Sequence, residues 1–303
     1  MSNPSARSPT ADALLAWYFV AVWGVGYVAT KVGLQHAPPF TLLTLRFAFG
    51  LLCMAPVVLL WRPVWPSTRA AFGHLIVAGL LMHAVQLGGS HYAQYLGMSA
   101  GVSALIISCQ PLLTALIASR WLGERLSARQ WAGIGIGLAG VGLVVWHKID
   151  IKEFGLGSIL GTVIALAGVT AATLYQRKFS PDSDLKAAAV VQFAASLAVL
   201  APLALAVEGF RIDWAWGMMV ALAFLVIFAS ILAVSVLHVL MRHNEATRVT
   251  SMMYLPPVFA VVAEMAIFGV VPSALGFAGM AITCLGVALA AWKSPRVVAA
   301  AVD

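Results

Sequence analysis

Two rows of polar side chains could contact a small molecule, because each row follows one face of an expected helix. The first row, within residues 70–96, consists of His83, Gln86, Ser90 and Gln94. The second row, within residues 100–119, consists of Ser103, Gln110 and Thr114. Neighbouring members are three, four or seven positions apart, which is the spacing of a single helix face. Such rows either line a hydrated cavity or form interhelical hydrogen bonds. We expect a cavity, because two adjacent rows exceed what packing needs.

Three further side chains are candidates for substrate contact because of their positions within the sequence. Trp23 lies well inside the apolar residues 12–30, whereas the other nine tryptophans lie near segment ends or in loops. Tyr254 directly precedes a leucine and a proline pair, and Arg46 lies about two turns into residues 40–61. The Arg46 guanidinium could hold a substrate carboxylate through two parallel hydrogen bonds, or it could bind backbone carbonyls at a helix end.

Three prolines are expected to break helices: Pro111, Pro256 and Pro257. Proline has no backbone N–H and clashes with the carbonyl four residues earlier. Pro111 should therefore leave the Ile107 carbonyl without its helical partner. The adjacent Gln110 is expected to point into the cavity, opposite His83 and Gln86.

Two groups of residues have roles that the sequence leaves open. Glu264 is the one acidic residue clearly inside an apolar segment. It could be a proton site, a partner for Arg46, or a side chain that reaches the membrane interface. His91, Tyr92 and Tyr95 lie on a different face from the first polar row, and we expect them in an interfacial aromatic belt.

The elements that must position these residues are expected to be ten membrane-spanning helices. The chain has 303 residues, of which 62% are hydrophobic and 10% are charged, whereas a soluble domain has about 25% charged residues. Apolar runs long enough to cross a bilayer, about 20 residues each, fill most of the chain. We expect spans at residues 12–30, 40–61, 70–96, 100–119, 129–146, 157–177, 186–207, 214–241, 246–268 and 273–292.

Lysine and arginine in the loops orient these spans, because cytoplasmic loops carry an excess of both. With a cytoplasmic N-terminus, thirteen basic residues fall in inner segments and four in outer segments. Both termini are therefore expected in the cytoplasm, with the protein in the inner or plasma membrane of the cell. The net charge of +7 follows from this distribution, so we expect no nucleic-acid partner.

An internal repeat relates the two halves of the chain at an ungapped offset of 146 residues. Matching pairs are Phe47 with Phe193, Pro111 with Pro257, Gly133 with Gly279 and Gly140 with Gly286. We expect residues 1–150 and 151–303 to be two copies of a five-helix unit, together one membrane domain. Because five is odd, the second copy enters from the opposite side of the membrane. The expected fold is an all-α membrane protein with ten transmembrane helices, in two inverted five-helix repeats around a central cavity.

Several motifs resemble those of the EamA-type transporters in the drug/metabolite transporter superfamily. The opening of the chain carries Trp23-Gly24, Lys31, Pro38-Pro39 and Leu45-Arg46-Phe47. The end of the first copy carries Tyr92, Ser103, Pro111, the Leu-Gly-Glu-Arg-Leu run at 122–126, Gln130 and the glycines between 133 and 142. The second copy departs from the pattern, since Val270-Val271-Pro272 follows Gly269 where an acidic residue would be usual.

Within this superfamily the chain is most similar to the YddG-type exporters of aromatic and other neutral amino acids. The resemblance implies a ten-helix basket with a large central cavity and outward movement of amino acids. Nucleotide sugars and cationic drugs are the alternative cargoes. Phosphorylated dianions would need several cationic residues at the cavity, and only Arg46 lies deep within a span.

An intramembrane enzyme is disfavoured, because the chain lacks G-x-S-x-G, H-E-x-x-H and two acids within one span. We expect no metal, since the cysteines lie isolated at positions 53, 109 and 284. No nucleotide-binding loop is present, so we expect neither a cofactor nor ATP-driven pumping. Gly133 and Gly137 form a GxxxG motif, which favours close packing within the bundle or at the seam of a homodimer.

Overall fold

The computed structural model describes residues 9–121, 126–150, 155–232, 236 and 255–291, and its regular structure over these residues is helical. The first half contains α1 (Pro9–Gly33), α2 (Pro39–Trp61), α3 (Arg69–Gly79), the π-helical turn η1 (Leu80–Val85), α4 (Gln86–Tyr95), α5 (Ala100–Ile107), α6 (Gln110–Trp121) and α7 (Ala128–Asp150). The second half contains α8 (Leu156–Phe179), α9 (Leu185–Leu203), the π-helical segment η2 (Ala204–Glu208), α10 (Trp216–Ala223), the π-helical segment η3 (Phe224–Leu232), α13 (Pro256–Phe268) and α14 (Ala274–Ala291).

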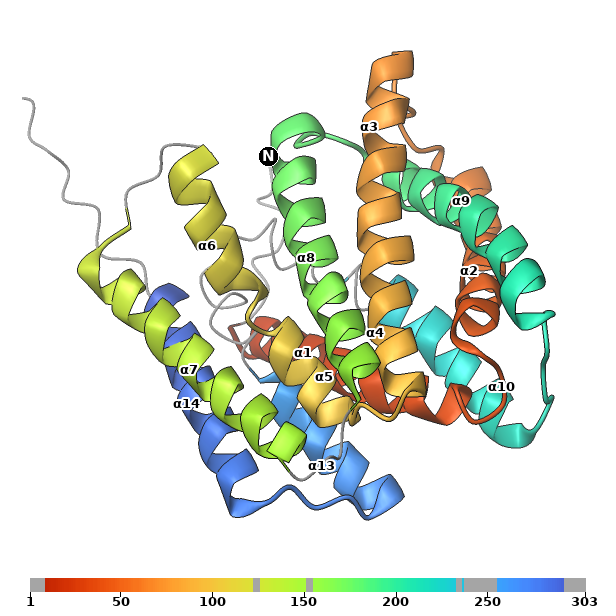
Figure 1. The fold of residues 1–303 in the computed structure, drawn as a ribbon. Coiled ribbons are helices and arrows are strands. Elements are labelled where there is room, and N and C mark those ends of the chain that lie inside the picture. Colours follow the sequence, from red (N-terminus) through yellow and green to blue (C-terminus); the bar gives the residue numbers. More distant parts are fainter. Residues whose placement is uncertain (1–8, 122–125, 151–154, 233–235, 237–254, 292–303) are drawn as a thin grey trace, which may run out of the picture.

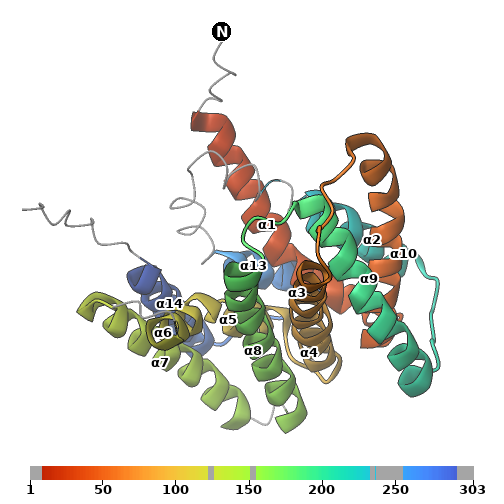
Figure 2. The ribbon, with the colours of Figure 1, turned by 90° about the horizontal axis from the view of Figure 1, so that it is seen from above.

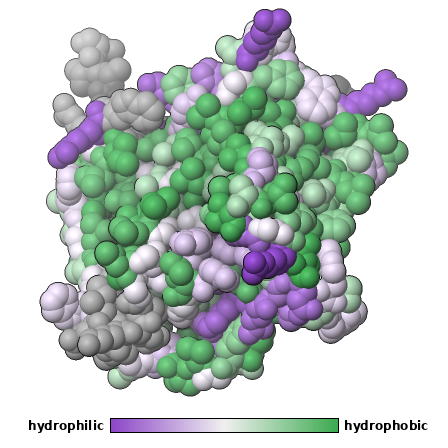
Figure 3. All heavy atoms as spheres, turned by 45° about the vertical axis from the view of Figure 1, so that its right-hand side comes forward, coloured by the Kyte–Doolittle hydropathy of each residue, from purple (hydrophilic) through white to green (hydrophobic). Residues whose placement is uncertain are grey.

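Each of the ten expected spans contains at least one helix among its described residues. Among the described residues, six helical segments are long and apolar enough to cross a membrane: Leu14–Gly33, Pro39–Trp61, Arg69–Tyr95, Ala100–Ile117, Leu156–Phe179 and Leu185–Glu208. In the same residues, three shorter apolar helices cover Trp216–Leu232, Pro256–Phe268 and Ala274–Ala290. Hydrophobic residues dominate the face of the molecule in Figure 3, as expected for a surface in contact with lipid.

The main helix contacts join the first half of the chain to the second. In Figures 1 and 2, α6, α7 and α14 lie on one side, α2, α9 and α10 on the other, and α4 beside α8 between them. Two pairs join helices that are equivalent under the 146-residue offset: α2 with α9, and α7 with α14. Other contacts are reciprocal, since α1 packs on α13 and α10 while α8 packs on their equivalents, α6 and α3. The two halves therefore contact each other through equivalent surfaces.

Glycine brings α7 and α14 into close, antiparallel contact (Figure 1). A Cβ atom on Gly133 would meet the backbone of Ala290, and one on Gly279 would meet the side chain of Val144. These two contacts are counterparts, because the offset of 146 carries Gly133 to Gly279 and Val144 to Ala290. Small residues at such positions let helix backbones approach closely. The GxxxG motif at 133–137 therefore packs against α14 of the same chain.

The third span is not a single regular α-helix, because the π-helical turn η1 precedes α4. The α4 helix then runs through Gly88, Gly89 and Ser90. Gly89 is needed for packing, because a Cβ atom there would meet the Gly161 carbonyl and Ala165 on α8.

The fourth span is two helices, with α5 ending at Ile107 and α6 beginning at Gln110. Pro111 lies in the first turn of α6, where a missing N–H costs no helical hydrogen bond. The α13 helix likewise begins at Pro256, with Pro257 as its second residue.

Candidate functional site

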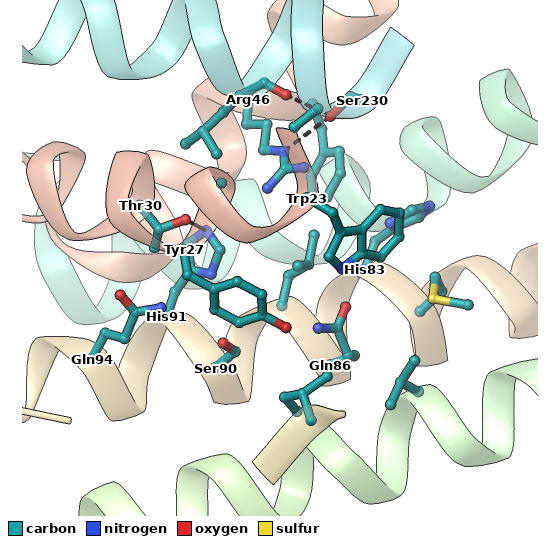
Figure 4. A pocket seen from close by; sticks show the side chains of 18 of the residues that line it. Trp23, Tyr27, Thr30, Arg46, His83, Gln86, Ser90, His91, Gln94 and Ser230 are labelled. Carbon is teal, nitrogen blue, oxygen red and sulfur yellow. Dashed lines mark hydrogen bonds between the residues drawn. The ribbon is translucent and has the colours of Figure 1, made fainter. Parts of the chain in front are cut away.

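A cavity of about 150 Å³ lies between the two halves of the chain (Figure 4). Its lining from the first half includes the polar and aromatic residues Trp23, Tyr27, Thr30, Arg46, Phe47, His83, Gln86, Ser90, His91 and Gln94. The second half contributes Val169, Phe193, Leu225, Ala229 and Ser230. The cavity is therefore polar along α4 and largely apolar where the second half closes it.

Two faces supply most of the polar and aromatic lining. On α1, Trp23, Tyr27 and Thr30 follow the spacing 4-3, which places them on one helix face. On the opposite side, the 3-4-4 row that begins at His83 follows η1 and α4 (Figure 4). A substrate in the cavity would lie between these two faces.

Both halves approach the cavity through a π-helical turn. His83 lies in η1, while Ala229 and Ser230 lie in η3. The offset of 146 carries residues 80–85 to 226–231, so the two irregular turns occupy equivalent places. π-Helical turns are frequent at functional sites, where the wider turn redirects side chains.

An aromatic cluster closes the part of the cavity next to His83. The His83 ring lies 5.3 Å from Phe47 and 5.2 Å from Phe193, measured between ring centroids. Phe47 and Phe193 are themselves 5.4 Å apart and are equivalent under the repeat. One ring from each half therefore meets at this end of the cavity.

Arg46 carries the permanent charge of the cavity. Its Nε donates a hydrogen bond to Ser230 Oγ over 3.1 Å, and Ser230 Oγ donates to the Leu225 carbonyl over 2.8 Å. The lining residues that the structure describes include no aspartate or glutamate. A guanidinium with no carboxylate among its described cavity neighbours is a natural site for an anionic ligand group.

Of the ten side chains that the sequence suggests for the cavity or for substrate contact, the structure places six in the cavity lining: Trp23, Arg46, His83, Gln86, Ser90 and Gln94. Gln110 does not line the cavity, and its Nε2 donates to Thr114 Oγ1 and Thr173 Oγ1, each over 3.1 Å. The expected row fails because the helix is interrupted between α5 and α6, so Ser103 and Gln110 do not share one face. Ser103 instead contacts Ser90, with 3.2 Å between their hydroxyl oxygens. Tyr254 lies outside the described residues.

Several lining residues escaped the sequence prediction. His91 was expected in an aromatic belt with Tyr92 and Tyr95, but it is 2% exposed and lines the cavity. Tyr92 and Tyr95, by contrast, are 42% and 52% exposed. The 4-3 spacing after Trp23 is the signal that could have identified Tyr27 and Thr30.

Glu264 has a structural environment that the sequence did not indicate. It is 3% exposed, and its Oε1 lies 2.6 Å from Lys31 Nζ. Its carboxylate also accepts hydrogen bonds from the backbone N–H groups of Ala100, over 3.0 Å, and Gly101, over 2.8 Å. The expectations that it pairs with Arg46 or reaches the membrane interface are therefore wrong.

Comparison with known proteins identifies the family. Residues 11–146 and 154–292 each match the EamA-like transporter family. A "Probable amino-acid metabolite efflux pump" of Salmonella typhimurium is 26% identical over 286 residues, which cover 91% of this chain and 93% of that protein. The "Uncharacterized inner membrane transporter YedA" of Escherichia coli strain K12 is 28% identical over 262 residues, 84% of this chain and 81% of that protein.

A crystal structure that is 20% identical in sequence has a TM-score of 0.64, and the match covers 93% of this chain and 98% of that one. At this identity the likeness shows a shared fold. The two family matches together cover most of the chain, and the family is one of transporters, not enzymes. The chain therefore belongs to the EamA-like transporter family and is a multi-pass membrane transporter.

Proposed function

We propose that the protein is a secondary transporter that exports small amphipathic metabolites, with aromatic and other neutral amino acids as its main substrates. The observation that carries this proposal is the composition of the cavity. Among the described lining residues, aromatic rings and polar uncharged groups surround one guanidinium, and none of these residues carries a carboxylate. Such a site suits a molecule that combines an apolar side chain with a carboxylate. We propose Trp23, Arg46, His83, Gln86 and Ser90 as substrate-binding residues.

The proposed mechanism is alternating access between two inverted repeats of five transmembrane helices each. Its support is the antiparallel pairing of α7 with α14 and the reciprocity of the contacts between the halves. A two-fold axis relates surfaces that contact each other in this way. Since the paired helices are antiparallel, this axis would lie in the membrane plane, as in other transporters with a central site. Rocking of one half against the other would then open the cavity to each side in turn.

The charge of the cavity favours amino acids over cationic drugs and nucleotide sugars as substrates. Among the cavity residues that the structure describes, a cationic drug would find no carboxylate to neutralise it, and a nucleotide sugar would find only Arg46 for its phosphates. The relatives called probable amino-acid metabolite efflux pumps, from Salmonella typhimurium and Escherichia coli, give independent support. We also propose an inner-membrane location, as in the name of the YedA relative.

Transport into proteoliposomes tests this function directly. The purified protein would be offered radiolabelled phenylalanine, leucine, a nucleotide sugar and a cationic drug, with and without a proton gradient. We expect saturable movement of the amino acids that protein-free liposomes do not show. Movement of the sugar or the drug without movement of any amino acid would overturn the proposal.

A further inference from the structure

The Gln94 side chain is buried in the cavity wall with its hydrogen-bonding capacity unused. The residue is 6% exposed and lies on α4 beside the cavity (Figure 4). Among the described residues, neither Oε1 nor Nε2 has a hydrogen-bond partner. A buried amide with both a donor and an acceptor unmet is unfavourable. A ligand that satisfies it must therefore offer an acceptor and a donor together.

The neighbours of Gln94 are polar and come from both sides of the cavity. Thr30 on α1 and His91 on α4 are each 2% exposed, and Thr30 Oγ1 lies 3.5 Å from His91 Nε2. Figure 4 places these three side chains at one end of the cavity, with Tyr27 and then Trp23 leading away from them. The polar end and the aromatic wall would thus contact different parts of one ligand.

We propose that Gln94, with Thr30 and His91, forms the subsite for the α-amino acid head group. The inference rests on the proposed function and names the chemical feature that this site recognises. The Gln94 Oε1 accepts from the substrate ammonium, and the Gln94 Nε2 donates to the substrate carboxylate. One carboxamide can satisfy both groups because they are attached to the same carbon. The substrate side chain then extends along Tyr27 and Trp23.

Charge considerations favour a zwitterion over a simple amine or a simple carboxylate. An amine would leave the Gln94 Nε2 unmet and would add a second cation to a cavity that already holds Arg46. A carboxylate without an ammonium would leave the Gln94 Oε1 unmet. A zwitterion brings its own counter-charge, so its ammonium needs only neutral acceptors. The Arg46 guanidinium lines the same cavity, so its positive charge also favours a carboxylate over an amine.

The first test uses the unmodified protein and three ligands with the same aromatic body. Phenylalanine, 3-phenylpropionate and phenethylamine would compete with radiolabelled phenylalanine in proteoliposome counterflow. We expect both analogues to compete at least about tenfold more weakly, the loss typical of one hydrogen bond to a charged group. Equal competition by either analogue would overturn the subsite while leaving the proposed function intact. Absence of phenylalanine transport would instead contradict the proposed function.

The second test replaces the carboxamide. Gln94→Met keeps the side-chain length and removes both polar atoms, so the KM for phenylalanine should rise about tenfold. The ratio by which phenylalanine competes more strongly than either analogue should fall. Gln94→Glu keeps an acceptor but repels the carboxylate, so phenethylamine should gain relative to phenylalanine. Gln35→Met, at an exposed position after α1, is the control and should leave the relative competition by the three ligands unchanged. An unchanged ranking in the Gln94 variants would overturn the proposal. If Gln94→Met does not fold, Gln94→Glu and the competition by the two analogues still test the proposed subsite.

Discussion

The Lys31 ammonium and the Glu264 carboxylate lie 2.6 Å apart and join α1 to α13, although 233 positions separate them in the sequence. The same carboxylate accepts from the first two N–H groups of α5. Three helices from both halves of the chain therefore meet at one buried acid. The cost of removing Glu264 from water is offset by one cation and by the partial positive charge of a helix N-terminus.

Glu264→Ala should destabilise the protein, since it leaves Lys31 and two backbone donors without their acceptor. We expect a loss of about 3 kcal/mol, with Glu264→Gln in between because its amide oxygen can still accept. Thermal unfolding of the detergent-solubilised protein would measure the effect. Asp213→Asn is the matched control, because the pair between His36 and Asp213 is exposed and such pairs contribute little.

The exchanged pair Lys31→Glu with Glu264→Lys should not restore stability. The exchange keeps opposite charges together, but it turns an ammonium toward the N–H groups of Ala100 and Gly101, which need an acceptor. Thermal unfolding of the double variant, beside each single variant, would test this. Full recovery would mean that the ion pair alone matters and that capping of α5 does not.

Arg46→Lys should weaken transport of carboxylate-bearing substrates even though the charge is kept. A lysine cannot reproduce the planar set of donors by which Arg46 binds Ser230 and holds its positive charge at the cavity. We expect the KM for phenylalanine to rise about tenfold in proteoliposomes, with Arg46→Met worse. If Arg46→Lys instead loses folded protein and keeps its KM, Arg46 has a structural role.

Gln110→Met should affect stability and leave substrate affinity unchanged. The Gln110 amide holds α6 to α8 through Thr173, away from the cavity lining. We expect a lower melting temperature with an unaltered KM, whereas Gln86→Met, in the lining, should raise KM. A raised KM for Gln110→Met would restore the cavity-facing position that the sequence suggested.

The first polar row was predictable from the sequence because Gln86, Ser90 and Gln94 all lie in α4, where helical spacing translates directly into a shared face. The second row was not, because the chain turns at residues 108–109, between α5 and α6. The sequence does contain the signal for this break in Pro111. Periodicity alone cannot tell a proline in the first turn of a new helix from a proline that kinks a continuous one.

The ion-pair partner of Glu264 could not be predicted from the sequence, because it depends on long-range packing. Its burial inside a span could be expected, but its partner depends on how α1, α5 and α13 meet. Several cations were available in the sequence, and Arg46 was no worse a choice by spacing than Lys31. The repeat, by contrast, was visible in the sequence because glycines and prolines at one offset serve packing in both halves, as Gly133 and Gly279 do.

Gly286→Ala should disrupt the seam between α7 and α14. A Cβ atom there would meet the backbone of Gly137, which cannot move aside as a side chain could. We expect a lower melting temperature for Gly286→Ala. Gly135→Ala is the control, because a Cβ atom there meets nothing within 4 Å, and alanine in an open helical position gains about 0.5–1 kcal/mol. Equal effects of the two substitutions would show that backbone contact at Gly286 is unimportant.

Ser67→Cys and Asp213→Cys should be labelled from opposite sides of the membrane. The two positions are 146 residues apart and are therefore equivalent in the two halves, which an inverted repeat places on opposite sides. The excess of basic residues in the loops predicts that position 67 faces the cytoplasm. In a variant without Cys53, Cys109 and Cys284, a membrane-impermeant maleimide added to intact cells should label position 213, and position 67 only after lysis. Labelling of both positions from outside would refute the inverted arrangement. Labelling of position 67 alone would reverse the predicted orientation while keeping the repeat.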